Sequence, residues 1–329
     1  MVEQPELGLD GEPELVFQPA VDLATGRLLG FEALLRWNDP VLGAIPPSVL
    51  IPWAEANGHM VALNAWVLSE ACAQAAGWDS DLQLAVNCSV FQLRKREAAS
   101  AAAAALEESG LNPDRLTIEI TEAGVADDVA AADLHAMSRL GIQLTVDDIG
   151  SDWSTLENLQ QFAINTMKID GSLIEGLARD GGVNRAIVET IVRVSHSLGV
   201  CTVAESVETA EQVAILRELG ADVGQGYFFA PPLAAEDAHA LTVMQPLPVF
   251  TLPPPTQTDQ DPADGPDEYT APAMAAEVMD ALNSVHAPAA SATTQAASTD
   301  HSAAPLETDD VALVSRKGRL MGSFRRGRS

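Results

Sequence analysis

Cysteine is scarce in this sequence, with three residues in 329, and neither a Cys-x-x-Cys pair nor a cluster of cysteine and histidine occurs. The sequence therefore argues against a disulfide framework and a zinc site, and Cys72, Cys88 and Cys201 are expected to be small buried hydrophobic residues. No apolar run approaches the roughly 20 residues of a membrane span. The acidic N-terminus also lacks the pattern of a signal peptide. A cytoplasmic protein without a transmembrane segment is predicted.

Positive charge is scarce as well, because 18 Lys and Arg stand against 47 Asp and Glu, a net charge of −29. A protein this acidic repels nucleic-acid polymers, which are therefore not expected as partners. A phosphate-bearing ligand would have to be attracted by a local positive feature, such as bound metal ions or a few well-placed Arg and Lys side chains.

Short β-like runs alternate with helical stretches between about residues 14 and 243, which is typical of an α/β fold with mostly parallel strands. Strands are expected at 16–19, 28–35, 82–87, 116–120, 143–146, 166–169, 201–204 and 222–224. Helices are expected at 64–78, 91–109, 127–140, 183–199 and 209–219. Eight strands in roughly 230 residues suit a (βα)8 barrel. A doubly wound open sheet is the alternative, although the GxGxxG turn expected after its first strand is missing.

The composition changes after the predicted barrel domain, which spans 14–243 and follows a leader at 1–13. Residues 244–329 are rich in Pro and Ala, and 245–315 contain no Lys or Arg, as is typical of a disordered tail. The basic end, RKGRLMGSFRRGRS at 316–329, is either a solvated charged segment or a docking peptide. Its partner, which is unknown, would be an anionic surface or the acidic barrel itself.

Polar and charged residues stand at or near the ends of most expected strands: Asn87, Glu119, Asp147 with Asp148, Lys168 with Asp170, Glu205 and Gln225, while the second strand carries Glu32. A single carboxylate at such a position is usually a surface residue or a helix cap. The complete set is more informative, because the carboxyl ends of barrel strands converge on one face. These side chains are therefore expected to share a pocket.

Several carboxylates in one pocket raise each other's pKa and need cations. The oxygen-rich set of Glu32, Asn87, Glu119, Asp147, Asp148 and Glu205 suits two hard ions, Mg²⁺ or Mn²⁺, with Ca²⁺ as a candidate inhibitor. Two such metals activate a water and stabilise in-line displacement at phosphorus, and Lys168 would orient that water or neutralise developing charge. The residues alone predict a metal-dependent hydrolase of phosphoryl type.

Seven motifs resemble, in order and spacing, those of bacterial EAL-domain phosphodiesterases. They are FEALLRW (31–37), VNCS (86–89), IEITE (118–122), DDIG (147–150), KID (168–170), AESVET (204–209) and QGYFF (225–229), and FQP (17–19) resembles the family's first strand. The resemblance covers about residues 14–235. It implies a signalling enzyme that hydrolyses cyclic di-GMP to linear pGpG. It also implies a modified TIM-type barrel in which one strand, the first, runs antiparallel to the others.

The resemblance also implies a role for each matching position. Glu32, Asn87, Glu119 and Asp147 resemble ligands of one metal, and Asp147, Asp148 and Glu205 resemble ligands of the second. Lys168 resembles the catalytic lysine beside the attacking water, so Glu32, Asp148, Lys168 and Glu205 are the expected catalytic residues. Arg36 resembles a phosphate-contacting arginine, and Gln18, Leu34 and Gln225 resemble substrate-facing residues. Glu122, Asp170 and Glu208 resemble carboxylates that brace the ligands, with Glu122 bracing the loop after Asp148.

Several positions depart from the family pattern, including NDP (38–40), which stands where RHP is common. In DDIGSDWST (147–155), Asp152 replaces a glycine of a loop that in the family positions a metal and contributes to dimer contacts. A homodimer through this loop is the candidate oligomer, and Asp152 bears on both dimerisation and metal affinity. Gly171 stands where arginine is common, and Ser206 stands where glycine is common. Since no ligand is lost, an active phosphodiesterase is the main prediction. A catalytically weak cyclic-di-GMP receptor and a ligand-independent interaction protein are the alternatives.

Overall fold

The first two strands form a long hairpin whose residues alternate between the two faces of the sheet. The computed structural model describes residues 11–78, 81–125, 127, 129–149, 162–178, 182–244 and 249–254. Strand β1 (Glu12–Asp22) alternates buried and less buried positions along its whole length, as one covered face requires. It pairs antiparallel with β2 (Leu28–Asp39), from Glu12 opposite Asn38 to Val21 opposite Leu28.

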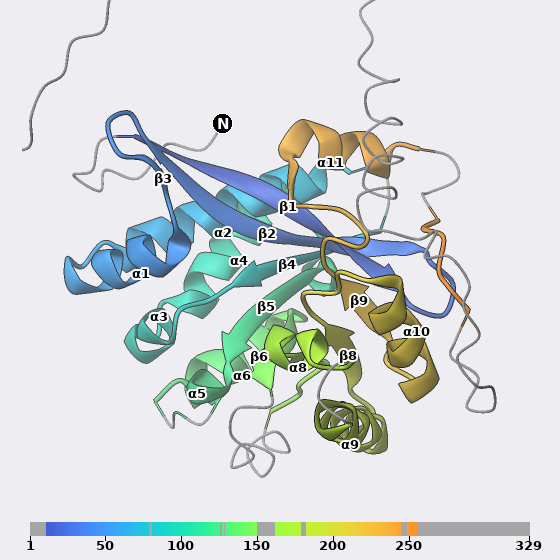
Figure 1. Cartoon of the computed structure of the whole chain (residues 1–329). Helices are drawn as coiled ribbons and strands as arrows, with labels where there is room; N and C mark the ends of the chain where they lie inside the picture. The colour runs from blue at the N-terminus through green and yellow to red at the C-terminus, as the bar shows by residue number, and fades with distance from the viewer. Residues whose placement is uncertain are drawn as a thin grey trace, which may run out of the picture. The chain divides into compact units, whose positions relative to one another are not determined.

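The remaining barrel strands run parallel to β2. They are β4 (Gln83–Asn87), β5 (Leu116–Thr121), β6 (Gln143–Ile149), β7 (Thr166–Ile169), β8 (Cys201–Ala204) and β9 (Val223–Gln225). The ring runs β1–β9–β8–β7–β6–β5–β4–β2 and closes where β2 pairs with β1 (Figure 1). Because β1 is antiparallel to both β2 and β9, the predicted barrel with one antiparallel strand is confirmed.

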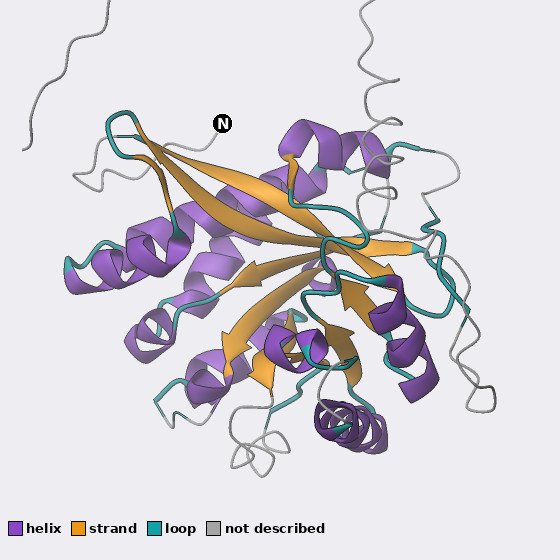
Figure 2. Cartoon of the chain, viewed as in Figure 1, coloured by secondary structure: helices purple, strands orange, loops and turns teal. Residues whose placement is uncertain are grey.

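Helices (purple) surround the barrel, whose strands (orange) lie at the centre of Figure 2. They are α1 (Pro47–Ala56), α2 (Met60–Ala76), α3 (Val90–Lys95), α4 (Ala98–Ser109), α5 (Glu122–Val125), α6 (Ala131–Leu140), α8 (Gly171–Glu175), α9 (Val183–Leu198), α10 (Ala210–Leu219), α11 (Ala235–Thr242) and the short 3-10 helix η1 (Pro113–Arg115). Their ends follow the local sequence. Helix α10 starts with a capping box between Thr209 and Gln212. It stops at Gly220, whose left-handed φ of 81° costs little conformational energy only in a residue without a Cβ.

The start of α4 is held by another helix. The side chain of Glu97, the N-cap residue of α4, makes no capping hydrogen bond. Instead, the buried carboxylate of Asp133 in α6 accepts hydrogen bonds from the backbone N–H groups of Ala98 and Ala99, at 2.9 and 3.2 Å. A carboxylate at a helix N-terminus satisfies orphan donors and complements the helix dipole, so Asp133 fixes α6 against α4.

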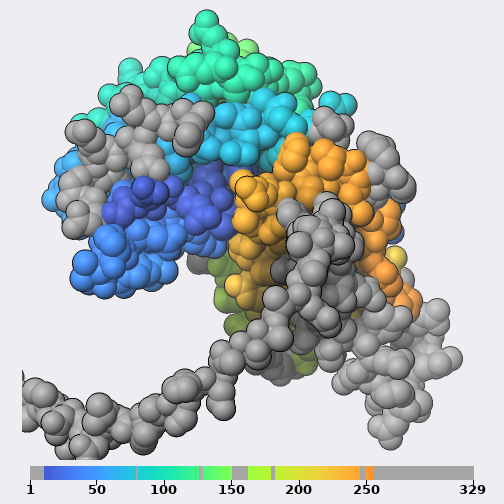
Figure 3. All heavy atoms as spheres, turned by 90° about the horizontal axis from the view of Figure 1, so that it is seen from above, coloured from blue at the N-terminus to red at the C-terminus, as the bar shows by residue number. Residues whose placement is uncertain are grey.

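Two short strands lie beside the ring. Strand β3 (Gly43–Ile45) returns along the outer end of β2, and β10 (Leu233–Ala234) pairs with β1 and leads into α11. In Figure 3 the region of β10 and α11 (gold to orange) lies beside the N-terminal strands (blue). No prediction from the sequence included these two strands, because runs of two or three residues carry no readable periodicity.

The packed part of the chain also includes residues 249–254, which fall inside the segment predicted as tail. Phe250 is buried, its ring centroid lies 5.9 Å from that of Phe229, and its N–H donates to the carbonyl of Gly26 at 2.7 Å. Among the described residues, no helix combines the length and the apolar composition that a membrane crossing requires.

Candidate functional site

The site residues come from the inward-facing positions of consecutive barrel strands. Side chains on a strand alternate between faces, so residues two apart share the barrel interior. Inward positions at or near the carboxyl ends of the parallel strands hold Asn87, Glu119, Asp147, Lys168 and Gln225, while Glu205 directly follows β8. Glu32 lies further back, in the part of β2 that pairs with β4. Gln18 joins them from the antiparallel β1, opposite Glu32 in register. The sequence prediction that these side chains share one pocket is consistent with this arrangement.

Lys168 lies at the centre of the cluster. Its Nζ is 2.6 Å from Glu205 Oε1, 2.9 Å from Glu119 Oε2, 3.2 Å from Glu32 Oε2 and 3.5 Å from Asp147 Oδ1. Burial alone would lower the pKa of this ammonium group, but the surrounding carboxylates, Glu119 first, raise it well above its usual value. Lys168 is therefore a permanent buried cation that neutralises part of the carboxylate charge.

Glu32 is kept ionised by the donors around it. Its Oε1 accepts from Asn87 Nδ2 at 2.6 Å, and its Oε2 accepts from Gln225 Nε2 at 2.8 Å. Burial works to raise the pKa of Glu32, but Lys168 and these amides outweigh it and lower the pKa. Gln225 Nε2 also donates to Gln18 Oε1 at 3.2 Å, which links the antiparallel strand to the cluster.

The other buried carboxyls hold protons more tightly. Burial, and next the charge of Glu32, raise the pKa of Glu119 well above its usual value. Burial also raises the pKa of Glu205 to about 7, although Lys168 opposes the shift. One lysine therefore does not offset all the negative charge of the cluster, which leaves it ready to accept a further cation in place of protons.

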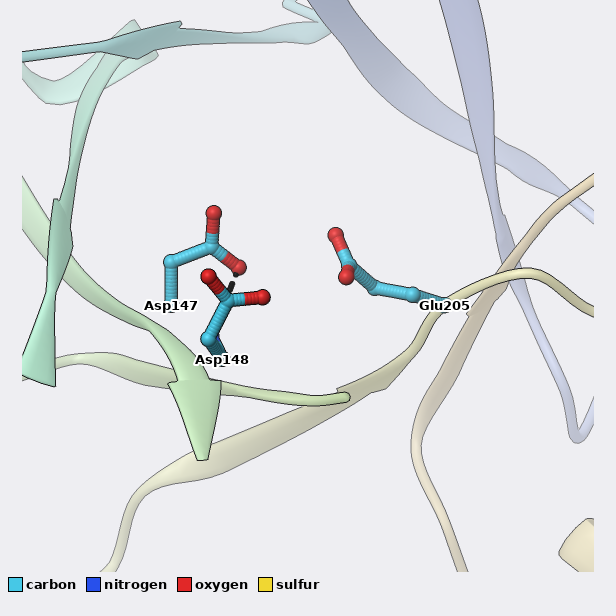
Figure 4. Close-up of side chains that lie close together, drawn as sticks. All are labelled: Asp147, Asp148 and Glu205. Atoms are coloured by element: carbon cyan, nitrogen blue, oxygen red, sulfur yellow. Dashed lines mark hydrogen bonds between the residues drawn. The ribbon is translucent and has the colours of Figure 1, made fainter. Parts of the chain in front are cut away.

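Asp147 and Asp148 point the same way because the strand is irregular between them. In a regular strand, neighbouring side chains lie on opposite faces. Here the register of β6 against β7 shifts between Val146 and Ile149, and Asp148 has a left-handed φ of 60°. Such a bulge re-aims a side chain. Figure 4 shows both carboxylates turned toward Glu205, with the N–H of Asp148 donating to Asp147 Oδ1 at 3.0 Å.

The carboxylates of Asp147, Asp148 and Glu205 form a donor set that fits a hard divalent cation. One carboxylate oxygen each from Asp147, Asp148 and Glu205 lies within 4.8 Å of the others. Burial, and next Asp147 and Asp170, raise the pKa of Asp148, so the three groups repel one another in the absence of a counter-charge. Oxygen-only ligands of this kind are those that Mg²⁺ and Mn²⁺ prefer.

The predicted substrate-facing residues Leu34 and Arg36 lie beside this cluster. They line a cavity of about 350 Å³ together with Asn87, Pro47 of α1 and Met60 of α2. The Arg36 guanidinium donates from Nη1 to the carbonyl of Leu35 at 2.9 Å, and its other nitrogens make no hydrogen bond within the part of the chain that the structure describes. The α1 and α2 side of this cavity was missed from the sequence, since its residues are ordinary apolar core types.

The three predicted bracing carboxylates lie at different places. Asp170 caps α8, where it accepts from the N–H of Ser172 at 2.8 Å. Glu122 is buried at the start of α5, beside the end of β5. Glu208 is exposed, and within the described part of the chain its carboxylate makes no hydrogen bond to the cluster. Residues 150–161 and 255–329, which carry the predicted dimer loop and basic tail, lie outside the described residues.

Known relatives have the same domain. A model of the EAL domain family matches residues 5–232. The chain is 40% identical over 225 residues to an uncharacterized signaling protein of Caulobacter vibrioides. This alignment covers 68% of this chain and 28% of that protein. It is 36% identical over 232 residues to MucR of Pseudomonas aeruginosa, a bifunctional diguanylate cyclase and cyclic di-GMP phosphodiesterase, covering 69% of this chain and 34% of that protein. The chain thus spans about a third or less of these two relatives.

Solved structures agree with the sequence relatives. The PaMucR phosphodiesterase in complex with c-di-GMP matches with a TM-score of 0.65 and 35% identity, over 68% of this chain and 93% of that one. The EAL domain of Mycobacterium smegmatis DcpA matches with a TM-score of 0.59 and 28% identity, over 70% of this chain and 97% of that one. Together with the closed barrel and the acidic cluster at its strand ends, these matches show that the chain belongs to the EAL-domain family.

Proposed function

We propose that this protein hydrolyses cyclic di-GMP to linear pGpG with the help of two divalent cations, Mg²⁺ or Mn²⁺. The observation that carries the proposal is the complete set of inward oxygen donors around Lys168. Glu32, Asn87, Glu119 and Asp147 would hold one cation, and Asp147, Asp148 and Glu205 the other. A relative and a solved neighbour that are named as cyclic di-GMP phosphodiesterases support the choice of substrate.

The side chains of the cluster divide the chemistry between them. When bound, the cations supply an activated water and neutralise charge at phosphorus. Lys168 keeps its proton and presents a fixed positive charge, which stabilises charge that develops nearby. In the metal-free site, burial raises the pKa of Glu205 to about 7, so a cation bound there would take the place of its proton. Asn87 and Gln225 hold the Glu32 carboxylate in one orientation and keep it ionised.

Arg36 and its cavity would bind the rest of the substrate. The chain has a net charge of −29, so a dinucleotide with two phosphates needs a local cation in order to approach. Arg36 supplies that charge at the rim of a cavity of about 350 Å³, in which Leu34, Ile51 and Met60 offer apolar surface to a base. Planar guanidinium groups suit phosphate oxygens because they donate two parallel hydrogen bonds.

The proposal is tested by incubating the purified protein with cyclic di-GMP and Mg²⁺ or Mn²⁺ and identifying the product by chromatography. Wild type should form pGpG, and an excess of chelator should stop it. Glu32→Gln, which removes one metal ligand with little change in shape, should abolish turnover, whereas Glu236→Gln on the exposed face of α11 should not. Full turnover in the presence of chelator would rule out the metal-dependent mechanism.

A cyclic-di-GMP receptor without hydrolysis is the second candidate. The observation in its favour is Asp152, which replaces a glycine in the loop that follows the paired aspartates. Calorimetry with cyclic di-GMP separates the two functions. Binding by a protein that forms no pGpG with either metal would favour the receptor, and Asp152→Gly would then be expected to restore turnover.

A further inference from the structure

The barrel interior is not filled below the carboxylate cluster. A cavity of about 190 Å³ runs from the undersides of Glu32 and Glu119 to the amino ends of the strands, where Gln83, Thr166 and Cys201 line it. The amino ends of the parallel strands lie at the face opposite the candidate catalytic mouth. One water needs only about 10–15 Å³ of such space, so the cavity has room for several.

Small side chains at inward positions create this space. Barrel interiors are usually closed by layers of Val, Ile and Leu. Here Ala20 and Gly30 face each other across β1 and β2, and Ala85 follows in register next to Glu32 on β4. Ala85 and Val203 face the interior from the middle of their strands, yet both are only half-buried. Solvent therefore reaches the middle of the barrel.

One wall of the cavity is a continuous polar row. In register across neighbouring parallel strands, Glu119 pairs with Thr145, Thr145 with Thr166, and Thr166 with Cys201. Adjacent strands are about 4.8 Å apart, which places each polar group within reach of a water that bridges it to the next. The row descends from a carboxylate of the site to the opening between Thr166 and Cys201.

Thr145 presents a hydroxyl to the cavity on this row. The residue is only 2% exposed, and its side chain lines the cavity. Within the described part of the chain, its hydroxyl makes no hydrogen bond to another residue. Because the Thr145 hydroxyl does not belong to the fully buried polar atoms that lack a partner, it is open to the cavity, where water can satisfy it. The cavity is accordingly polar and roomy enough for bound water along this wall.

We propose that this cavity is a second, water-filled entrance to the site. It opens at the amino ends of the strands and leads along Thr166 and Thr145 to Glu119. The inference rests on the proposed function in one respect: hydrolysis consumes one water for each phosphodiester bond cleaved. A dinucleotide bound over Arg36 covers the carboxyl-end mouth, so replacement water enters from the opposite end of the barrel.

Access is tested first with the small neutral reagent methyl methanethiosulfonate, using the full chain at mildly alkaline pH and locating modified thiols by peptide mapping. Cys201 should react many-fold faster than Cys72, which is fully buried and lines neither this cavity nor the one beside Arg36. Thr166→Leu should slow the reaction of Cys201 several-fold, while the isosteric Thr166→Val should not. A Cys201 no more reactive than Cys72 would overturn the entrance. This readout needs no activity, so it stands even if hydrolysis is never detected.

The supply of water is tested by steady-state kinetics on a matched pair. Cys201→Phe fills the opening and should lower kcat several-fold while KM stays unchanged, because the substrate binds at the other end. Cys201→Ala, which leaves the passage open, should keep the wild-type kcat. Equal kcat values in the two variants would overturn the supply role. If Cys201→Phe does not fold, as judged by circular dichroism, Thr166→Leu replaces it.

Discussion

Ser206 occupies the space that a side chain on Gly171 would need. A methyl group on Gly171 would lie 2.5 Å from Ser206 Oγ and 2.8 Å from Ser206 Cβ. Ser206 itself has a left-handed φ of 52°, which favours glycine. The two departures from the family pattern, a glycine where arginine is common and a serine where glycine is common, are therefore physically coupled at one contact.

This contact predicts non-additive stability effects. Gly171→Ala should lower the free energy of unfolding by about 1–3 kcal/mol through overpacking. In a Ser206→Gly background the same change should cost clearly less, because its obstacle is gone. Denaturant unfolding of the four proteins gives the coupling energy, which should be about 1 kcal/mol or more. Additive effects would show that the contact relaxes freely.

Lys168 is predicted to hold the apo site together. Lys168→Met leaves several buried carboxylates without their counter-ion and should lower the free energy of unfolding by about 3–5 kcal/mol in the presence of chelator. The exposed Lys95, whose ammonium group lies 5.4 Å from the centroid of the Phe91 ring, provides the control. Lys95→Met should change stability by less than about 1 kcal/mol.

Two conditions should rescue the Lys168→Met variant. Added Mn²⁺ should raise its melting temperature more than that of wild type, since cations replace the missing charge. Lower pH should act in the same direction. In the wild type, burial raises the pKa of Glu205 from 4.5 to about 7, so the folded state binds this proton more tightly than the unfolded chain. That contribution to stability grows as the pH falls from about 7 toward 4.5. A variant insensitive to both would contradict the assigned role of Lys168.

The barrel and the ring of site residues were predictable because two regular patterns coincide. Short strands alternating with helices indicate parallel strands, and the carboxyl ends of such strands converge when the sheet closes. Asn87, Glu119, Asp147 and Lys168 each stand at or near such an end, so their grouping follows from order along the chain, whereas Glu32 lies in the middle of the long β2. Their roles in catalysis remain predictions, since they rest on the family resemblance.

Other features depend on geometry that no residue pattern states. A period of two would place Asp147 and Asp148 on opposite faces, and only the bulge and the left-handed Asp148 bring them together. The segment after residue 243 was predicted as a tail from its average composition, which does not distinguish Phe250, a buried ring in a proline-rich stretch. The cavity below the site arises from small residues on strands far apart in the sequence, whose alignment depends on register.

Phe250 is predicted to contribute to the stability of the barrel. Its ring packs against Phe229, and its backbone carbonyl approaches Gly26 so closely that a Cβ there would lie 2.1 Å away. Phe250→Ala should lower the free energy of unfolding by about 3 kcal/mol or more. Val249→Ala, at a 62% exposed position, should change it by less than about 0.5 kcal/mol. Thermal and denaturant unfolding of the full chain would measure both, and equal effects would contradict the packing role.

Asp148 is predicted to trade stability for function. Its φ of 60° is unfavourable for a residue with a Cβ, and its carboxylate is repelled by Asp147 and Asp170. Asp148→Gly should therefore stabilise the apo protein by up to about 1 kcal/mol, while it removes a predicted metal ligand and abolishes hydrolysis. Ser206→Gly is the matched control, because it relieves the same kind of backbone strain without removing a carboxylate. It should gain similar stability and keep its turnover. Denaturant unfolding in chelator, together with the pGpG assay, decides the matter. If Asp148→Gly is destabilised, the strained conformation is not a cost to the fold, and if it remains active, the second metal does not depend on this ligand.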